Sequence, residues 1–156
     1  MKYYYGLRDK KHLSDCVEKA VRVFGGGYRA NALVMETSAA ETHCGTFPDR
    51  HEKTLGVGLT QFDQIGLDDL IMRVRSKDRK KLSQYYDVDL DMVKLADLAY
   101  NPELACALTR LKYKLRPEPI PPTLEGRAKY WKRFYNSVYG DGTPEEYIER
   151  VEEFLP

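Results

Sequence analysis

Residues 28–45 read YRANALVMETSAAETHCG. A helix built from this stretch carries apolar side chains on most of its sides, and such a helix is normally buried within a domain. Gly45 closes the stretch, and glycine is the usual residue where a helix stops. We therefore expect a central helix over about residues 28–43, with Glu41 near its C-terminal end.

Helical periodicity also dominates on both sides of this stretch. Residues 10–24 place apolar side chains at helical spacing, and the three glycines 25–27 then end that helix. Asn101 and Thr143 each precede a proline, which is the pattern of a capped helix start. The helices expected on this basis cover about 10–24, 28–43, 66–74, 91–99, 102–115, 124–138 and 144–155, and the charged stretch 76–87 is interpreted as a connection.

The pattern breaks over residues 46–63, TFPDRHEKTLGVGLTQFD. Pro48, Gly56 and Gly58 indicate a loop or a short hairpin there. The chain has 156 residues, contains no repeat and is long enough to bury a core without disulfides or a structural metal. The sequence therefore predicts a mainly α protein, one domain over 1–156, with a loop-rich or short β-hairpin insert after the second helix.

Charge and cysteine usage bear on the possible partners of the chain and on its cellular compartment. The net charge is only +1, but residues 105–135 are basic and residues 141–156 are acidic. The basic region could meet a polyanion, or the two regions could simply be solvated helix surfaces; no nucleic-acid-binding motif accompanies them. The three cysteines form no CxxC pair, which is typical of a reducing cytoplasm. We expect no signal peptide and no membrane span.

Glu41 is the first candidate for chemistry. A carboxyl group at the end of an apolar helix loses hydration, and the resulting rise in its pKa suits a general acid that works near neutrality. Glycines in the following loop would let the backbone approach a substrate closely, while Gln61 and Asp63 supply polar groups at its edge.

Glu36 is a rival acid on the same helix. It lies five residues before Glu41, so at 100° per residue the two side chains point about 140° apart and cannot share one role. Helical periodicity does not choose between them, whereas the spacing to Gly45 favours Glu41. A solvated helix-end residue is the structural alternative for Glu41, although an anion is unfavourable at that end.

His43, Cys44 and His51 belong to residue types that bind zinc. Neighbouring side chains at a helix end diverge, and no fourth ligand follows at a usual spacing. We interpret these residues as loop histidines and a small buried cysteine, and expect neither a metal nor a cofactor.

Together, these motifs resemble the lysozyme-like superfamily. Residues 41–45 resemble the Glu-Ser-His-x-Gly that ends the catalytic helix of goose-type lysozymes, and residues 58–63 are similar to the Gly-Leu-Met-Gln-x-Asp that follows it. Soluble lytic transglycosylases carry the corresponding Glu-Ser and Gly-Leu-Met-Gln, an Asn-initiated helix like that at Asn101, and an Ala-Tyr-Asn like residues 134–136. The tract 100–143 also resembles small lysozyme-like proteins carried in bacteriophage particles.

The resemblance covers about residues 28–150, with departures from the family pattern. Thr42 replaces Ser, Thr60 replaces Met, and Ser137-Val138 stands where transglycosylases have Ala-Gly. The wall of the sugar cleft is therefore expected to differ from that of the family.

The resemblance implies a role for each matching residue. Glu41 would protonate the oxygen between N-acetylmuramic acid and N-acetylglucosamine, and Tyr135 would hydrogen-bond to its carboxyl group. Asp63 could act as a base on an attacking water. The implied substrate-binding residues are Gly58, Thr60 and Gln61 in the cleft, Asn136, and Asp49 as a further carboxylate.

The implied function is cleavage of peptidoglycan glycan strands, as a muramidase or a lytic transglycosylase. The phage resemblance implies a virion enzyme, made in the host cytoplasm, that acts on the host cell envelope beside other tail proteins. Two alternatives remain open: a structural tail or ejection protein without turnover, and an endolysin that lyses the host.

Overall fold

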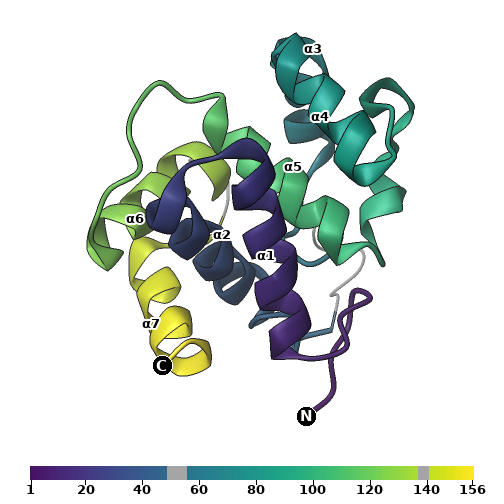
Figure 1. The fold of residues 1–156 in the computed structure, drawn as a ribbon. Coiled ribbons are helices and arrows are strands. Elements are labelled where there is room, and N and C mark those ends of the chain that lie inside the picture. The colour runs from purple at the N-terminus through teal and green to yellow at the C-terminus, as the bar shows by residue number, and fades with distance from the viewer. Residues whose placement is uncertain (49–55, 137–140) are drawn as a thin grey trace.

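The computed structural model is described here for residues 1–48, 56–136 and 141–156. It is mainly helical, which confirms the expected α class (Figure 1). Within the described ranges, pairing of the β type is limited to one isolated antiparallel bridge between Val57 and Phe62. The helices are α1 Lys10–Phe24, α2 Gly27–Thr42, α3 Gln64–Arg73, α4 Ser76–Tyr86, α5 Pro102–Lys114, α6 Leu124–Trp131 and α7 Pro144–Phe154, with short 3₁₀ turns η2 Leu90–Met92 and η3 Leu95–Leu98 and a π-helical turn η4 Lys132–Asn136.

The helices pack on two sides of α5. α1 lies against α5 and α2, and α2 lies against α7, which also contacts α6. α3 and α4 both pack on α5 and stand together at the top of the view in Figure 1. The C-terminal end of α2 therefore meets α7 and the α6 region, the segments that surround Glu41.

The expected helix starts at Asn101 and Thr143 are confirmed. The Asn101 side chain accepts a hydrogen bond from the Leu104 N–H at 3.0 Å, and Thr143 Oγ1 accepts one from the Glu146 N–H at 3.1 Å. In both helices a proline occupies the first turn, where its missing N–H costs nothing. These local signals act within a few residues, which is why sequence alone located them.

The expected connection over 76–87 is wrong, because residues 76–86 form α4. This helix lacks a broad apolar stripe and is held instead by two anchors. Leu82 is fully buried, and the buried carboxylate of Asp78 accepts a hydrogen bond from Lys114 Nζ at 3.0 Å. A tertiary ion pair thus stabilises a helix that hydrophobic periodicity did not reveal.

The expected helix over 91–99 is replaced by η2 and η3. The side chains of Asp89 and Asp97 accept hydrogen bonds from the backbone N–H groups of Asp91 and Lys94, at 3.0 and 2.8 Å. Aspartates favour such local bonds over a continuous helix. The segment therefore forms two short turns.

The expected aromatic helix over 124–138 changes form partway. α6 ends at Trp131 and continues as the π-helical turn η4, while residues 137 and 138 lie outside the described ranges. A π turn adds a residue per turn and so rotates the side chains that follow it, and such turns are frequent at functional sites. Tyr135 lies on η4.

Aromatic side chains occupy the centre of the core. Trp131, Tyr113 and Tyr147 are among the largest fully buried side chains.

Among the helices described, none is both long and apolar enough to cross a membrane.

Candidate active site

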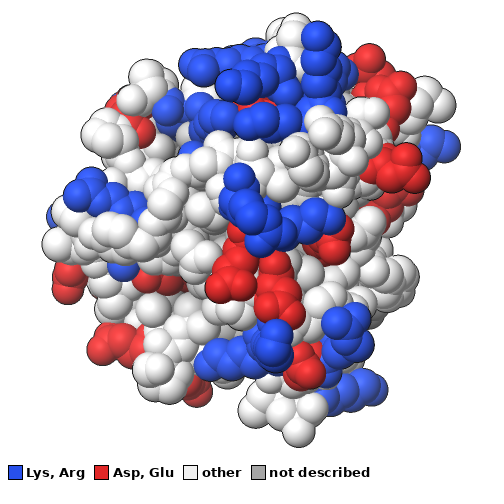
Figure 2. All heavy atoms as spheres, viewed as in Figure 1, with Lys and Arg blue, Asp and Glu red and all other residues white. Residues whose placement is uncertain are grey.

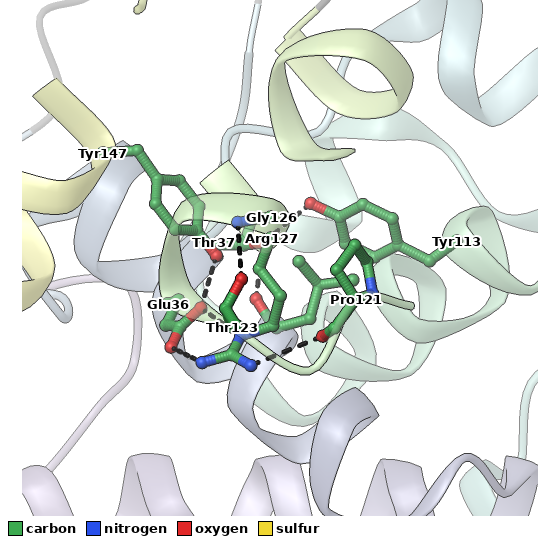
Figure 3. Close-up of polar contacts among 9 residues, drawn as sticks. Glu36, Thr37, Tyr113, Pro121, Thr123, Gly126, Arg127 and Tyr147 are labelled. Atoms are coloured by element: carbon green, nitrogen blue, oxygen red, sulfur yellow. Dashed lines mark hydrogen bonds and ion pairs between the residues drawn. The ribbon is translucent and has the colours of Figure 1, made fainter. Parts of the chain in front are cut away.

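The carboxylate of Glu36 belongs to a buried ion pair. Glu36 is 7% exposed and accepts hydrogen bonds from Arg127 Nε at 2.8 Å and Nη2 at 2.9 Å, and a third from the Tyr147 hydroxyl at 2.8 Å. Figure 3 shows the guanidinium and the phenol converging on it. With both oxygens occupied by strong donors, Glu36 has a structural role.

Glu41 has very different surroundings on the same helix. It is half-buried, and its Oε2 accepts a hydrogen bond from the Trp131 indole Nε1 at 3.0 Å. Burial raises the pKa of Glu41 from 4.5 to about 7, even though the Trp131 hydrogen bond and the charges of Arg150 and Lys112 lower it. This shift moves the titration of the carboxyl group from the acidic range towards neutral pH.

The end of α2 is held by its own backbone and by α7. His43, Cys44 and Gly45 all have positive φ, 53°, 58° and 82°, so the chain turns sharply after Thr42. Arg150 of α7 donates a hydrogen bond to the carbonyl oxygen of Ala40. This contact fixes the last turn of α2, and with it the position of Glu41.

His43 and Cys44 pack against the C-terminal helix. The His43 ring stacks on Phe154 at a centroid distance of 4.4 Å, and Cys44 is buried. Burial raises the pKa of the Cys44 thiol, which disfavours the reactive thiolate. Among the described residues, no group of three or more His, Cys, Asp and Glu side chains could hold a metal ion, and His51 lies outside the described ranges.

Two hydrogen bonds tie the turn at 58–61 to the rest of the site. Thr42 Oγ1 donates to the Leu59 carbonyl oxygen at 2.6 Å, and the Tyr135 hydroxyl donates to the Thr60 carbonyl oxygen at 2.6 Å. Thr42 directly follows Glu41, so the end of α2, the turn and η4 are joined at one place. Segments far apart in the sequence thus meet beside Glu41.

Tyr135 does not make the contact expected of it. Its single hydroxyl hydrogen goes to Thr60, and among the described residues the donor to the Glu41 carboxyl is the indole of Trp131. The Tyr135 ring stacks on Tyr113 at a centroid distance of 5.4 Å. Tyr135 therefore supports the turn at 58–61, and Trp131 is the residue that contacts the Glu41 carboxyl group.

The turn residues differ in what they can offer a substrate. Thr60 is fully buried and its Oγ1 accepts a hydrogen bond from Thr109 Oγ1 at 2.8 Å, so this side chain has its partner within the fold, and the expected role of Thr60 in substrate binding stays a prediction. Gln61 is half-buried and folds back, with Nε2 donating to the Gly58 carbonyl oxygen at 3.0 Å. Gly58 has φ +81°, and a Cβ there would lie 2.3 Å from the Leu98 carbonyl oxygen.

Asp63 and Asn136 both have local partners. Asp63 Oδ1 accepts the N–H of Gly66 at 2.7 Å and so caps α3, although its charge is close enough to Glu41 to raise the pKa of that group. Asn136 Oδ1 accepts a hydrogen bond from Lys132 Nζ at 2.9 Å. Asp49, the other expected carboxylate, lies outside the described ranges.

Lys112 is a charged residue of this region that the sequence analysis did not single out. It is 8% exposed, and its Nζ lies 4.2 Å from the centroid of the Tyr135 ring and 5.3 Å from that of Phe62. It donates a hydrogen bond to the Tyr135 carbonyl oxygen, which is long at 3.5 Å. Burial lowers the pKa of Lys112, while the charges of Asp63 and Glu41 oppose that shift.

A sequence signal for Lys112 did exist. It lies four and eight residues after Leu108 and Leu104, on the stripe of α5 that faces the core. A lysine on such a stripe is almost always paired or functional, because burying a charge is costly. The contact of Trp131 with Glu41 had no comparable signal, since the two residues are 90 positions apart.

The chain was also compared with known proteins. No protein-family model, no curated protein and no solved structure matches it. Interpretation of the site therefore depends on its geometry and on the motif resemblance.

Proposed function

We propose that this protein cleaves the β-1,4 glycan strand of peptidoglycan with Glu41 as the general acid, on a lysozyme-like scaffold. The observation that carries the proposal is the raised pKa of Glu41, about 7, on a carboxyl group that has one indole donor and no ion-pair partner among the described residues. A general acid needs such a proton near neutrality. The motif order around Glu41 supplies the substrate class.

The chemistry follows from this one proton. Protonated Glu41 gives its proton to the glycosidic oxygen, the bond from that oxygen to C1 breaks, and positive charge develops on the sugar ring. The N-acetyl oxygen of the same sugar can bond to C1; the sugar's own 6-hydroxyl then attacks C1, displaces that oxygen and gives its proton to the Glu41 carboxylate, and an anhydro product forms. If a carboxylate such as Asp63 activates a water instead, a hydrolysed product of inverted configuration forms.

Trp131 supports the acid in a specific way. Its N–H donates to the carboxylate form of Glu41, so it stabilises the group after the proton has left. This bond also orients the carboxyl group. We assign Trp131 as a positioning residue for Glu41.

The setting follows from the resemblance to phage particle proteins. We propose that the enzyme is a virion component that opens the host wall locally, beside other tail proteins. Mass spectrometry of purified virions tests this, because an endolysin would be absent from the particles.

The test of the proposal is cleavage of purified peptidoglycan by the unmodified protein and by Glu41→Gln. The matched control is Glu18→Gln, which neutralises an exposed glutamate on α1. We expect clearing by the unmodified protein and by the control, and loss of at least about 100-fold with Glu41→Gln, the scale of general acid catalysis. Absence of clearing by all three proteins would contradict the proposal and favour a structural tail protein.

Product analysis separates the two chemistries. Anhydromuramic ends would identify a lytic transglycosylase, and reducing ends would identify a muramidase. With reducing ends, Asp63→Asn should also lower the rate, whereas with anhydro ends Asp63 acts only as the cap of α3.

A further inference from the structure

Lys and Arg side chains gather at the end of the molecule where α3 and α4 stand (Figures 1 and 2). A hollow of about 120 Å³ lies in this region, between the end of α3, the start of α4 and the end of α5. Its lining includes the cations Arg73, Arg75 and Lys114 and the carboxylate of Asp78. It is separate from Glu41 and plays no part in the proposed glycan chemistry.

Two of these cations have structural partners. Lys114 Nζ contacts Asp78 Oδ1 at 3.0 Å, and Arg73 Nη1 contacts Asp69 Oδ2 at 3.1 Å. Both also lie in the last turns of their helices, where a cation offsets the negative end of the helix dipole. Fold stability therefore accounts for Arg73 and Lys114.

Fold stability does not account in the same way for Arg75 or for the neighbouring Arg116. The exposed side chain of Arg75 makes no hydrogen bond or ion pair with any residue in the described ranges. Arg116 Nη2 lies 3.9 Å from the same Asp69 oxygen that Arg73 contacts, and its buried Nε has no hydrogen-bond partner among the described residues. The lining itself holds three cations, Arg73, Arg75 and Lys114, against the single carboxylate of Asp78, so the hollow carries a net positive charge.

The backbone adds donors at the same place. Arg75 is the N-cap residue of α4 and its side chain makes no capping bond, so the first N–H groups of the helix, at Ser76 and Lys77, lack a side-chain acceptor from the cap position. The N-terminus of a helix carries partial positive charge and favours anions. Guanidinium groups beside it can hold two oxygens of one anion at once.

We propose that this hollow, bounded by Arg73, Arg75 and Lys114 at the start of α4, binds a phosphate group. The chemistry is that of a tetrahedral oxyanion, which Arg75 contacts directly while Arg73 and Lys114 supply further charge. The phosphate could be free or part of a polymer, and the experiment below distinguishes these two sources.

Titration of the ¹⁵N-labelled protein with inorganic phosphate tests the site, with chloride at equal ionic strength as the reference. We expect saturable shifts of the Ser76 and Lys77 amide signals with phosphate only. Arg75→Gln should weaken phosphate binding about tenfold, as expected for the loss of one charge-assisted hydrogen bond. The control Lys80→Gln removes an equal charge from an exposed position of α4 outside the hollow and should leave affinity within about twofold.

A second titration, with a short oligothymidylate, identifies the source. Tighter binding than inorganic phosphate, sensitive to Arg75→Gln and to salt, would assign the site to a phosphate within a polymer. Binding of inorganic phosphate alone would assign it to a free phosphate. Phosphate shifts no larger than those from chloride, or equal losses in Arg75→Gln and Lys80→Gln, would overturn the proposal. Because the readout is binding, the result is independent of whether Glu41 cleaves glycans.

Discussion

Glu36 and Glu41 lie on the same helix, and their carboxyl groups have opposite surroundings. Glu36 is 7% exposed and bound by Arg127 and Tyr147, whereas Glu41 accepts one hydrogen bond, from Trp131, and has its pKa raised to about 7. The first arrangement stabilises a charge and the second disfavours it. The two residues therefore separate into a structural anion and a candidate proton donor.

Glu36→Gln should lower the free energy of unfolding by about 3 kcal/mol, because it leaves the buried guanidinium of Arg127 without its counter-charge. Urea unfolding at neutral pH measures this. Asp91→Asn is the matched control, since it breaks the Arg79–Asp91 pair, in which the aspartate side chain is 64% exposed. Loss of an exposed ion pair should lower the free energy of unfolding by less than about 1 kcal/mol. Equal losses in the two variants would contradict the assigned role of Glu36.

The protonation of Glu41 should make stability depend on pH. Its folded-state pKa, about 7, lies above the ordinary value of 4.5, so between these values the folded protein holds a proton that the unfolded chain releases. The contribution is fully present below pH 4.5 and is lost as the pH rises towards 7, a fall of about 3 kcal/mol. Urea unfolding from pH 4 to 8 should show this fall, and Glu41→Gln should lack it. An unchanged pH dependence in the variant would place the proton elsewhere.

Trp131→Phe should raise the pKa of Glu41 further, because it removes the N–H that stabilises the carboxylate. A hydrogen bond to a charged group corresponds to about one pKa unit. The alkaline limb of the pH–rate profile for glycan cleavage should therefore move to higher pH by about that amount. ¹³C NMR of the Glu41 carboxyl reports the same shift without any activity. A limb at the original pH would show that the indole bond does not set the titration.

Lys112→Met should also raise the pKa of Glu41, because the lysine charge lowers it. Lys112→Met should also increase the free energy of unfolding, whereas truncation of an apolar core side chain decreases it. Among the described residues this buried ammonium has one long hydrogen bond, which costs free energy, so an apolar side chain of similar length should stabilise the fold by about 1 kcal/mol at pH 7. Carboxyl NMR and urea unfolding measure the two effects. Lys129→Met, an exposed change on α6, controls for net charge and should alter neither.

Gly58→Ala should destabilise the turn beside the acid. Gly58 has φ +81° and a Cβ there would lie 2.3 Å from the Leu98 carbonyl oxygen, so the variant suffers both backbone strain and a clash. Gly27→Ala is the control, because Gly27 has φ +63° and open space around it. Strain alone costs about 1 kcal/mol, and Gly58→Ala should lose at least about 2 kcal/mol more in thermal or urea unfolding. Equal losses would mean that the contact with Leu98 relaxes freely.

The sequence by itself determined most of the helices. The caps at Asn101 and Thr143 and the end of α1 at Gly25 depend on hydrogen bonds and backbone preferences within a few residues, which a linear pattern records. The same holds for α2, whose apolar composition required burial. Periodicity missed α4, because one leucine and an ion pair from α5 hold that helix in place.

Only the tertiary structure showed that the two glutamates of α2 have different surroundings. Arg127 reaches Glu36 across 91 positions and Trp131 reaches Glu41 across 90, and no local rule specifies such contacts. The hydrogen bond that buries Thr60 against Thr109 of α5 was likewise settled by tertiary packing. The pKa of a carboxyl group depends on everything that surrounds it in space, so its value emerges only when distant segments come together.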